Sequence, residues 1–411
     1  MVGSDRLFDR LLPSALVGLA LLGAYQQRPS LVSFALALLL TLLATRYWSR
    51  HCLDRVSYER HTSDDRAFPG DELLLTLRIS NPKLLPLPWL EVEDRVPEAL
   101  EPAPADGDGE AKDAKGRVSL AGSLGWHERI GWRYRLRCRR RGVYPLGPAT
   151  ISSGDPFGFF PRTAGAGESE RLVVYPRLIP LERLGLPPGF PMGERKAERW
   201  IFEDPSRMAG VRDYRPEDPF HRIHWKATAR RQQLQVKVHE PTTTLETALF
   251  IGVETFLPDP GARGEGDVGE NGEAFELAVS AVASLANRLI GQRHPVGLYL
   301  NGGSEGSRGA IEVPPGASQE QLIRILETLA GVEPSTCDAL ERMLDRVVPR
   351  LPWGSSAIVA VGGLPESLLG SLQGLVEMGH RPVVLLAGEE PAPEGLRGVT
   401  IHRLISNPVE V

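Results

Sequence analysis

The charged residues between Gly210 and Arg230 could form a site. Arg212, Asp218 and Arg222 lie close together among prolines, and a guanidinium group presents a rigid fork of donors that matches a carboxylate. We interpret the segment as a structural clamp, with a partner-binding surface as the second interpretation and catalysis as the least favoured. The residues assigned to this motif are Gly210, Arg212, Tyr214, Asp218, Arg222, Trp225 and Lys226.

Two histidines in the same segment raise the question of a metal site. His221 and His224 are spaced i, i+3 and follow Asp218, but this spacing alone does not specify a metal. Trp225 is more typical of a packing anchor than of a ligand platform. We therefore predict no metal at this motif.

The signatures of common nucleotide-binding proteins are missing where they would be needed. The predicted strand Ala248–Val253 is followed by Glu254-Thr255-Phe256-Leu257-Pro258, with no glycine-rich turn for a dinucleotide. The sequence contains no Gly-x-x-x-x-Gly-Lys-Ser/Thr loop for phosphate. We predict a non-enzymatic scaffold or adaptor without a cofactor. The alternative is a hydrolase whose site is assembled in space from distant residues.

The elements that must position these residues are clearest in the C-terminal part. Residues 245–411 alternate short apolar segments with segments whose apolar residues recur at helical spacing. Ala248–Val253 and Val296–Leu300 are predicted strands, and Ser318 with Gln321 predicts a capped helix start. This alternation predicts a doubly wound α/β domain with a parallel sheet.

The middle of the chain has the pattern of β-structure. Residues 51–180 contain short alternating segments such as Leu73–Ser80 and Val143–Ile151, separated by Pro and Gly, which predicts an immunoglobulin-like β-sandwich. Phe157, Phe159 and Phe160 are expected to cover the bottom of its core. Residues 181–244 are predicted to link the sandwich to the α/β domain through the Arg212, Asp218 and Arg222 motif.

One predicted strand, Trp132–Cys138, alternates arginines with apolar residues. The apolar residues should face the core, and the other face should carry Arg133, Arg135, Arg137 and Arg139. Four aligned guanidinium groups would suit anionic lipid or nucleic acid. A solvated face, partly neutralised by Glu91 and Glu93, is the favoured interpretation.

Residues 1–50 predict a transmembrane helical hairpin. Leu11–Tyr25 and Leu31–Thr45 are uncharged apolar runs of 15 residues each, short against the usual range of about 17–25 for a spanning helix. A signal peptide would explain the first run but not the second, and a buried hairpin of a soluble domain is the other alternative. Only Arg28 lies in the turn, whereas five arginines flank the hairpin. The positive-inside rule then predicts a multi-pass protein of the inner (cytoplasmic) membrane with its soluble domains in the cytoplasm.

Composition narrows the function classes further. The net charge of −5 and the pI near 6.1 argue against a general nucleic-acid binder. The apolar fraction of 42% excludes a fully disordered chain. Cys52, Cys138 and Cys337 are far apart and match neither a zinc pattern nor a disulfide framework. A reducing compartment is the simplest interpretation.

The chain resembles the domain-of-unknown-function-58 family. The resemblance is carried by Arg140–Pro148, Asp155–Phe160 and above all Gly210–Arg230. It implies a membrane-tethered β-sandwich protein with a von Willebrand factor A-like C-terminal domain. It also implies a MoxR-type AAA+ ATPase as partner, in the maturation of protein complexes or in cell-envelope processes. The fold class that we predict is multidomain α+β, with a helical hairpin, a β-sandwich and a doubly wound α/β domain.

The same resemblance raises a second metal question. Von Willebrand A-like domains carry Asp-x-Ser-x-Ser after their first strand, which suits a hard cation such as Mg²⁺. With Val253 in the Asp position the carboxylate is lost. With Glu254 there, Phe256 and Pro258 replace both serines. We predict no metal, and a weak site shared by Glu254 and Glu366 is the alternative.

Overall fold

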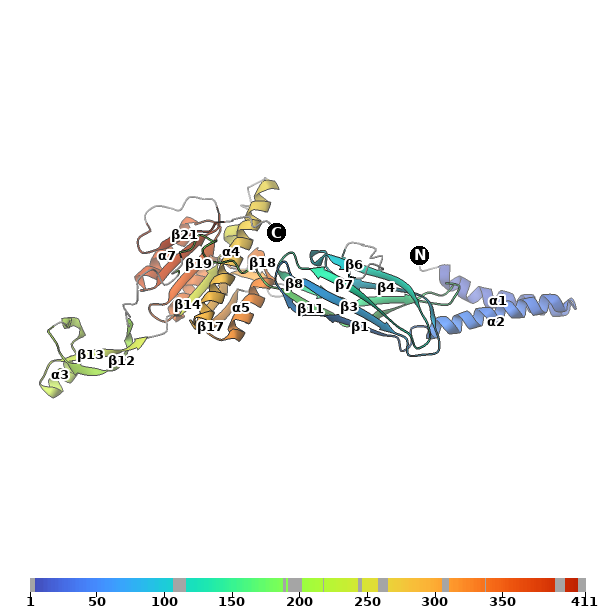
Figure 1. The fold of residues 1–411 in the computed structure, drawn as a ribbon, viewed down its shortest axis with the longest axis horizontal. Coiled ribbons are helices and arrows are strands. Elements are labelled where there is room, and N and C mark those ends of the chain that lie inside the picture. Colours follow the sequence, from blue (N-terminus) through green and yellow to red (C-terminus); the bar gives the residue numbers. More distant parts are fainter. Residues whose placement is uncertain are drawn as a thin grey trace. The chain divides into compact units, whose positions relative to one another are not determined.

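The computed structural model describes residues 4–105, 116–187, 190, 202–216, 218–242, 246–257, 265–304, 310–336, 338–388 and 396–405. The chain forms two compact units, Met1–Val174 and Tyr175–Val411 (Figure 1). The third cysteine, Cys337, lies outside the described residues, and Cys52 and Cys138 are buried free thiols.

The first unit begins with two antiparallel helices, α1 (Ser4–Tyr25) and α2 (Pro29–His51). They meet closely at Gly23, where a Cβ atom would lie 3.0 Å from the side chain of Leu31. Pro29–His51 is long and apolar enough to cross a membrane, and only 11% of its apolar window is buried. Asn271–Gly291 passes the same test but is 67% buried, as befits the core helix of a globular domain. The apolar side chains of α2 are therefore mostly exposed in the structure, unlike those of a core helix.

A β-sandwich follows the helices. Its first sheet has the order β1 (Ser57–Thr62), β3 (Glu72–Ser80), β7 (Arg129–Arg137) and β5 (Pro102–Pro104). Its second has the order β10 (Arg162–Ala166), β9 (Ala149–Ser153), β4 (Leu87–Arg95) and β6 (Arg117–Leu124). All pairings in both sheets are antiparallel. A third, smaller sheet joins β2 (Arg66–Ala67), β11 (Glu170–Val174) and β8 (Gly142–Leu146), and the turn η1 (Glu98–Leu100) follows β4.

The core lies between the two large sheets. Alternate residues of β3 point into it, and one buried cluster combines Leu75 and Leu77 of β3 with Val92 of β4 and Leu120 of β6. The prediction for the arginine strand is confirmed, because Tyr134, Leu136 and Cys138 are buried while Arg133, Arg135, Arg137 and Arg139 are exposed.

Two expectations about the sandwich are wrong. The segment Val143–Ile151 is not one strand but two, β8 and β9, because the chain turns at Gly147, whose φ is +77°. Phe157 and Phe159 do not cover the core: they are 63% and 67% exposed. The buried Asp155 instead holds their loop, since its carboxylate accepts hydrogen bonds from the N–H groups of Phe157 (3.0 Å) and Phe160 (2.7 Å).

The second unit contains a six-stranded sheet with helices on both faces (Figure 1). Its order is β17 (Ile311–Gly316), β15 (Val296–Leu300), β14 (Thr247–Ile251), β19 (Ser356–Val361), β20 (Arg381–Leu386) and β21 (Thr400–Arg403). In chain order this is 3-2-1-4-5-6, a doubly wound arrangement. The predicted parallel sheet is confirmed for five strands, whereas β17 is an antiparallel edge strand.

The remaining elements of this unit surround the sheet. The helices are α4 (Glu265–Gly291), α5 (Gln319–Gly331), α6 (Leu340–Val347) and α7 (Glu366–Glu377), and short turns are η3 (Val253–Phe256) and η4 (Val348–Arg350). Side chains of α6 and α7 pack with Phe250 and Val359 in one cluster, and α4 covers the opposite face beside α5. A second pair of strands joins β16 (Gly302–Ser304) and β18 (Val332–Thr336).

The edge strand β17 contains an irregularity that a buried side chain compensates. Pro314 and Pro315 occupy the point where the register with β15 shifts, and proline has no N–H for the ladder. The buried Gln321 of α5 donates from Nε2 to the carbonyl oxygens of Val296 (3.0 Å) and Pro314 (2.7 Å). Its amide therefore replaces the donor that the prolines lack.

Candidate functional site

The motif around Arg212 lies on a hairpin of the second unit. Strand β12 (Phe202–Asp213) pairs with β13 (Gln235–Thr242), and Gly210 follows a shift in their register. The chain between the strands forms the turn η2 (Phe220–Arg222) and the helix α3 (Trp225–Arg231). We call residues 214–234 the excursion. The sequence predicted this region only as a link between two domains, so the hairpin is seen in the structure alone.

Arg212 and Asp218 form the predicted charged contact. The guanidinium Nη1 and Nη2 lie 2.7 and 2.5 Å from Oδ2 and Oδ1 of Asp218, which is the two-point geometry of a strong ion pair. The N–H of Arg215 also donates to Oδ2 at 2.8 Å. The hydrogen bonds from Arg212 and Arg215 hold the pKa of the Asp218 carboxyl below its usual value. The pair therefore fixes the start of the excursion to the end of β12.

Arg222 does not complete the predicted three-member network. Within the described part of the chain, the donors to the Asp218 carboxylate are Arg212 and Arg215. Arg222 lies in η2 with a half-buried side chain, and its N–H donates to the carbonyl of Pro219 at 3.0 Å. The structure thus places two of the three residues in one ion pair.

A buried glutamine fixes the other end of the excursion. Gln235 is fully buried, and its Nε2 donates to Oδ1 of Asp213 at 2.6 Å. Its N–H donates to the Thr228 hydroxyl at 3.0 Å, and Arg231 donates to its Oε1 at 3.3 Å. Because a buried amide without partners is costly, these bonds hold α3 in one position against β13.

The two histidines of the motif, His221 and His224, do not lie in a cluster of metal-binding side chains among the described residues. Nδ1 of His224 accepts a hydrogen bond from the N–H of Ala227 at 3.0 Å and caps α3. His221 is exposed in η2. Across the described ranges, no group of three or more His, Cys, Asp or Glu side chains is placed to hold a metal ion.

The outer surface of the excursion is aromatic. The ring of Tyr214 stacks on Phe220 with centroids 5.9 Å apart. Phe220 and Trp225 are 73% and 69% exposed, and Lys226 is exposed beside Trp225. The expectation that Trp225 is a packing anchor is therefore wrong. We call Tyr214, Phe220 and Trp225 the aromatic surface.

The end of strand β14 is closed by internal hydrogen bonds. The Glu254 carboxylate accepts from the N–H of Leu340 at 2.7 Å and from Nδ2 of Asn301. Asn301 is fully buried and accepts from the N–H of Val253 at 2.7 Å. Burial raises the pKa of Glu254. Both oxygens of Glu254 are therefore engaged by groups of the protein. Glu366 is exposed in the first turn of α7.

Two glycine patterns in this unit match enzyme motifs by letter but not by structure. Gly302–Gly306 matches Gly-x-Ser-x-Gly, yet Ser304 ends strand β16 and is paired with Val332. A nucleophile elbow needs the serine on a sharp turn from strand to helix. Gly264–Gly269 matches Gly-x-Gly-x-x-Gly, but its last five residues lie inside α4 and not on the turn after β14.

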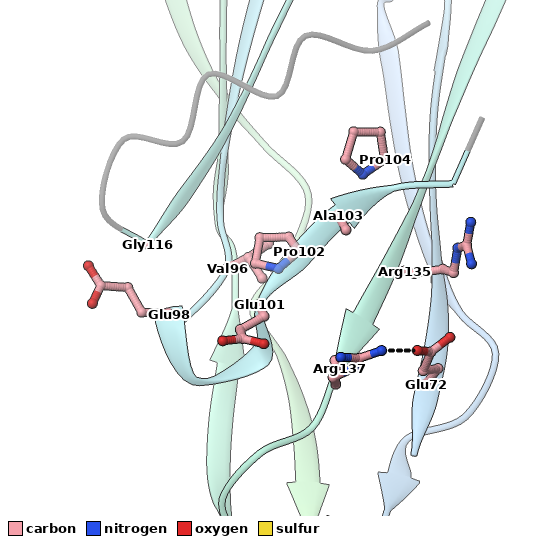
Figure 2. Close-up of a pocket in the computed structure, with 10 residues that line it drawn as sticks. All are labelled: Glu72, Val96, Glu98, Glu101, Pro102, Ala103, Pro104, Gly116, Arg135 and Arg137. Atoms are coloured by element: carbon pink, nitrogen blue, oxygen red, sulfur yellow. Dashed lines mark hydrogen bonds and ion pairs between the residues drawn. The ribbon is translucent and has the colours of Figure 1, made fainter. Parts of the chain in front are cut away.

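A groove of about 750 Å³ lies at the end of the sandwich near η1 (Figure 2). Its lining includes Glu98, Glu101, Arg135 and Arg137. Arg137 contacts Glu72 at 2.8 Å (Figure 2), and Arg139 contacts Glu101 at the same distance. The row of exposed arginines on β7 and just after it is thus partly neutralised. The predicted Glu91 and Glu93 do not contribute, since β4 belongs to the other sheet.

Comparison with known proteins finds a family that part of the chain resembles. The model of the family "Protein of unknown function DUF58" matches residues 210–351. That range includes the excursion and the sheet up to η4. The uncharacterized protein YeaD of Bacillus subtilis (strain 168) is 27% identical over 354 residues, which are 83% of this chain and 78% of that protein. The resemblance seen in Gly210–Arg230 is thereby confirmed.

Solved structures share shorter stretches with this chain. Native alpha-2-macroglobulin from Escherichia coli, from domain MG7 to its C-terminus, has a TM-score of 0.24 and 17% identity over 29% of this chain and 23% of that chain. An aerotolerance-related membrane protein from Bacteroides fragilis has a TM-score of 0.23 and 11% identity over 34% of this chain and 67% of that chain. This chain therefore spans less than a quarter of the macroglobulin fragment.

Sequence reasoning missed three residues that shape these regions. Gln235 and Asn301 were overlooked. Asn301 follows the apolar run Val296–Leu300 as a lone amide, which is a usable signal for a buried hydrogen-bonding group. Gln235 stands close to Gln232 and Gln233 and carries no such signal. Phe220 was read only as part of the motif. No local signal distinguishes an exposed aromatic residue from a buried one.

Proposed function

We propose that this protein is a membrane-anchored, non-enzymatic adaptor that presents the aromatic surface to a protein partner. The observation that carries the proposal is the exposure of Phe220 and Trp225 on an excursion held by Arg212 and Asp218. Exposed rings cost solvation free energy unless a partner covers them. Tryptophan and tyrosine are also enriched among the residues that dominate binding at interfaces.

The fixed backbone of the excursion supports a binding role. The ion pair to Asp218 and the bonds of Gln235 restrain it at both ends. A surface that is already ordered loses less conformational entropy on binding. The aromatic surface is thus suited to recognition of a partner protein.

The anchoring part of the proposal rests on α1 and α2. Their apolar side chains, including Phe34 and Leu40 at 61% and 59% exposure, would be covered by lipid. The flanking arginines orient the hairpin with both ends in the cytoplasm, in the inner membrane. This topology is testable by labelling intact cells with an impermeant thiol reagent: Gln27→Cys should react, and labelling of Gly109→Cys would overturn it.

The class of partner follows from the family resemblance. In this proposal the α/β unit is von Willebrand factor A-like, which its 3-2-1-4-5-6 strand order supports. The partner is a MoxR-type AAA+ ATPase, and the process is maturation of protein complexes or a cell-envelope function. The sealed end of β14 at Glu254 supports recognition by surface shape without a bridging metal.

The test is capture of partners from native membranes by the tagged full chain. The double variant Phe220→Ala, Trp225→Ala should lose capture of an AAA+ ATPase, as detected by mass spectrometry. Met378→Ala, which removes a side chain of 47% exposure from the same unit, is the matched control and should capture as well as the unaltered chain. Equal capture by the double variant would contradict the proposal.

A further inference from the structure

A second set of exposed apolar side chains lies at one end of the β-sandwich. Leu84 and Trp126 are each 70% exposed, and Phe157 and Phe159 are 63% and 67% exposed with their rings stacked 5.7 Å apart. These residues come from three separate loops, 81–86, 125–128 and 154–161. Exposed apolar groups gathered in this way mark a contact with a protein or a membrane.

All three loops are bonded to one another or to the end of helix α2. The Ser49 hydroxyl donates to the carbonyl of Phe160 at 2.6 Å. Lys83 donates to the carbonyl of Asp54 at 2.7 Å and also to that of Cys52. The third loop joins through Asn81, whose Nδ2 donates to Gly125 at 2.8 Å.

The junction between α2 and the sandwich is also packed. Cys52 is fully buried in the sandwich core, and Trp48, Leu53 and Val56 pack against the same cluster. Side chains from the last turn of α2 therefore belong to the core of the β-domain. Because a close-packed core resists deformation, the depth of α2 in a membrane sets the depth of these loops.

The length of α2 determines how deep the loops lie relative to the bilayer. Its uncharged run Leu31–Thr45 spans roughly 22 Å at a rise of about 1.5 Å per residue, short of the hydrocarbon core of about 30 Å. With this run centred in the core, Ser49, one helical turn beyond Thr45, lies roughly 17 Å from the bilayer midplane, just outside the hydrocarbon core and within the polar layer that extends about 5–7 Å beyond it. The loop bonded to Ser49 therefore lies at the level of the lipid headgroups.

We propose that this end of the sandwich is seated on the bilayer, with Leu84, Trp126, Phe157 and Phe159 inserted into its interfacial layer. The inference rests on the proposed anchoring by α1 and α2 and extends it to the β-domain. Aromatic rings favour this layer, and hydrogen bonds join the loops of the patch to the end of α2. The sandwich is thus a second membrane contact, and the domain is not free to tumble on its helices.

The test uses variants of the full chain with one reactive cysteine, in phosphatidylcholine/phosphatidylglycerol vesicles. The background is Cys337→Ser, in which the buried Cys52 and Cys138 should take no label. An environment-sensitive fluorophore is attached at Phe157→Cys or Trp126→Cys in the loops, or at Leu40→Cys in the middle of α2. The control is Glu98→Cys, which is exposed beyond the opposite end of β4.

Lipids carrying a spin label near the headgroup serve as quenchers. The two loop positions should lose emission with these lipids, Leu40→Cys should lose it with lipids labelled deep in the acyl chain, and Glu98→Cys should keep it. Loop positions that behave like Glu98→Cys, while Leu40→Cys is quenched, would overturn the seating and leave the anchoring intact. Blue-shifted loop emission without quenching would mean that another protein copy covers the patch, which also overturns it. If Leu40→Cys is not quenched either, the anchoring fails and the seating fails with it.

Discussion

Arg60 and Asp94 form a two-point ion pair inside the β-sandwich. Nε and Nη2 of Arg60 lie 2.9 and 2.7 Å from Oδ2 and Oδ1 of Asp94, and their side chains are 2% and 0% exposed. The Tyr58 hydroxyl donates to the same carboxylate at 2.7 Å. Burial and this carboxylate hold the pKa of Tyr58 well above its usual value. Since β1 and β4 belong to different sheets, the pair connects the two layers.

Replacing the carboxylate should destabilise the sandwich strongly. In Asp94→Ala the guanidinium of Arg60 stays buried without its counter-ion, which should cost about 3–5 kcal/mol of unfolding free energy. Glu93→Ala is the control, because Glu93 contacts Arg117 on the surface at 3.4 Å and should cost about 1 kcal/mol or less. Denaturant unfolding of the full chain in detergent measures both. Equal costs would contradict the role assigned to the pair.

Gly147→Ala should be more destabilising than Gly158→Ala. Both glycines have φ above +70°, so alanine adds backbone strain of about 1–2 kcal/mol at either position. At Gly147 the new Cβ would also collide with the guanidinium of Arg60, whereas at Gly158 no atom of the described residues lies within 4 Å. Arg60 cannot move away without losing Asp94. Unfolding midpoints of the two variants compare them directly, and a smaller effect at Gly147 would argue against the collision.

Asp218→Ala should loosen the excursion. The variant removes the acceptor for Arg212 and for the N–H of Arg215, so amide exchange in residues 212–235 should accelerate. Capture of the partner should weaken in parallel if the excursion is the binding site. Asp345→Ala, at the surface of α6, offers a charge-matched control. If neither exchange nor capture changed, the clamp hypothesis would be wrong.

The same contact predicts a dependence on pH. Because Arg212 and Arg215 lower the pKa of Asp218 in the folded state, its stabilising contribution is complete above the unfolded value of about 3.9. It is lost as the pH falls through the lowered pKa. Exchange protection of residues 212–235 should therefore decline only in strongly acidic solution. Asp218→Asn should remove this transition, and a transition retained in that variant would assign it to another group.

Divalent cations should leave the melting temperature unchanged. Both oxygens of Glu254 accept hydrogen bonds from the protein, so a cation would have to displace Leu340 and Asn301. A ligand present at 100 times its dissociation constant would add about 2.7 kcal/mol of stability. Melts of the full chain with Mg²⁺, with Mn²⁺ and with EDTA should coincide. A rise of several degrees that Glu254→Ala abolishes would show that a site exists.

Elements encoded by local sequence could be predicted closely. The strand Val296–Leu300 was predicted with the bounds that the structure gives, because a short apolar run at the centre of a parallel sheet is buried on both faces. The helix start at Ser318 was also correct: its hydroxyl accepts from the N–H of Gln321 at 3.2 Å. Both signals depend only on neighbours in the sequence.

Features that depend on distant neighbours could not be predicted in this way. Phe157, Phe159 and Trp225 were expected in contact with a core because burial of an aromatic ring is usually favourable. The partner of Arg60 is 34 residues away on the other sheet, and Glu254 meets Leu340 across 86 residues. No spacing rule joins such pairs, so the closed end of β14 emerged only from the fold.

The two prolines of β17 restrict how the sheet can grow. An open edge strand normally offers a row of N–H and C=O groups on which another chain can add a strand. Pro314 and Pro315 interrupt that row of donors, and Gln321 satisfies the carbonyl oxygen of Pro314 from within the domain. A foreign strand therefore finds no continuous ladder at this edge, which protects the domain from edge-to-edge aggregation.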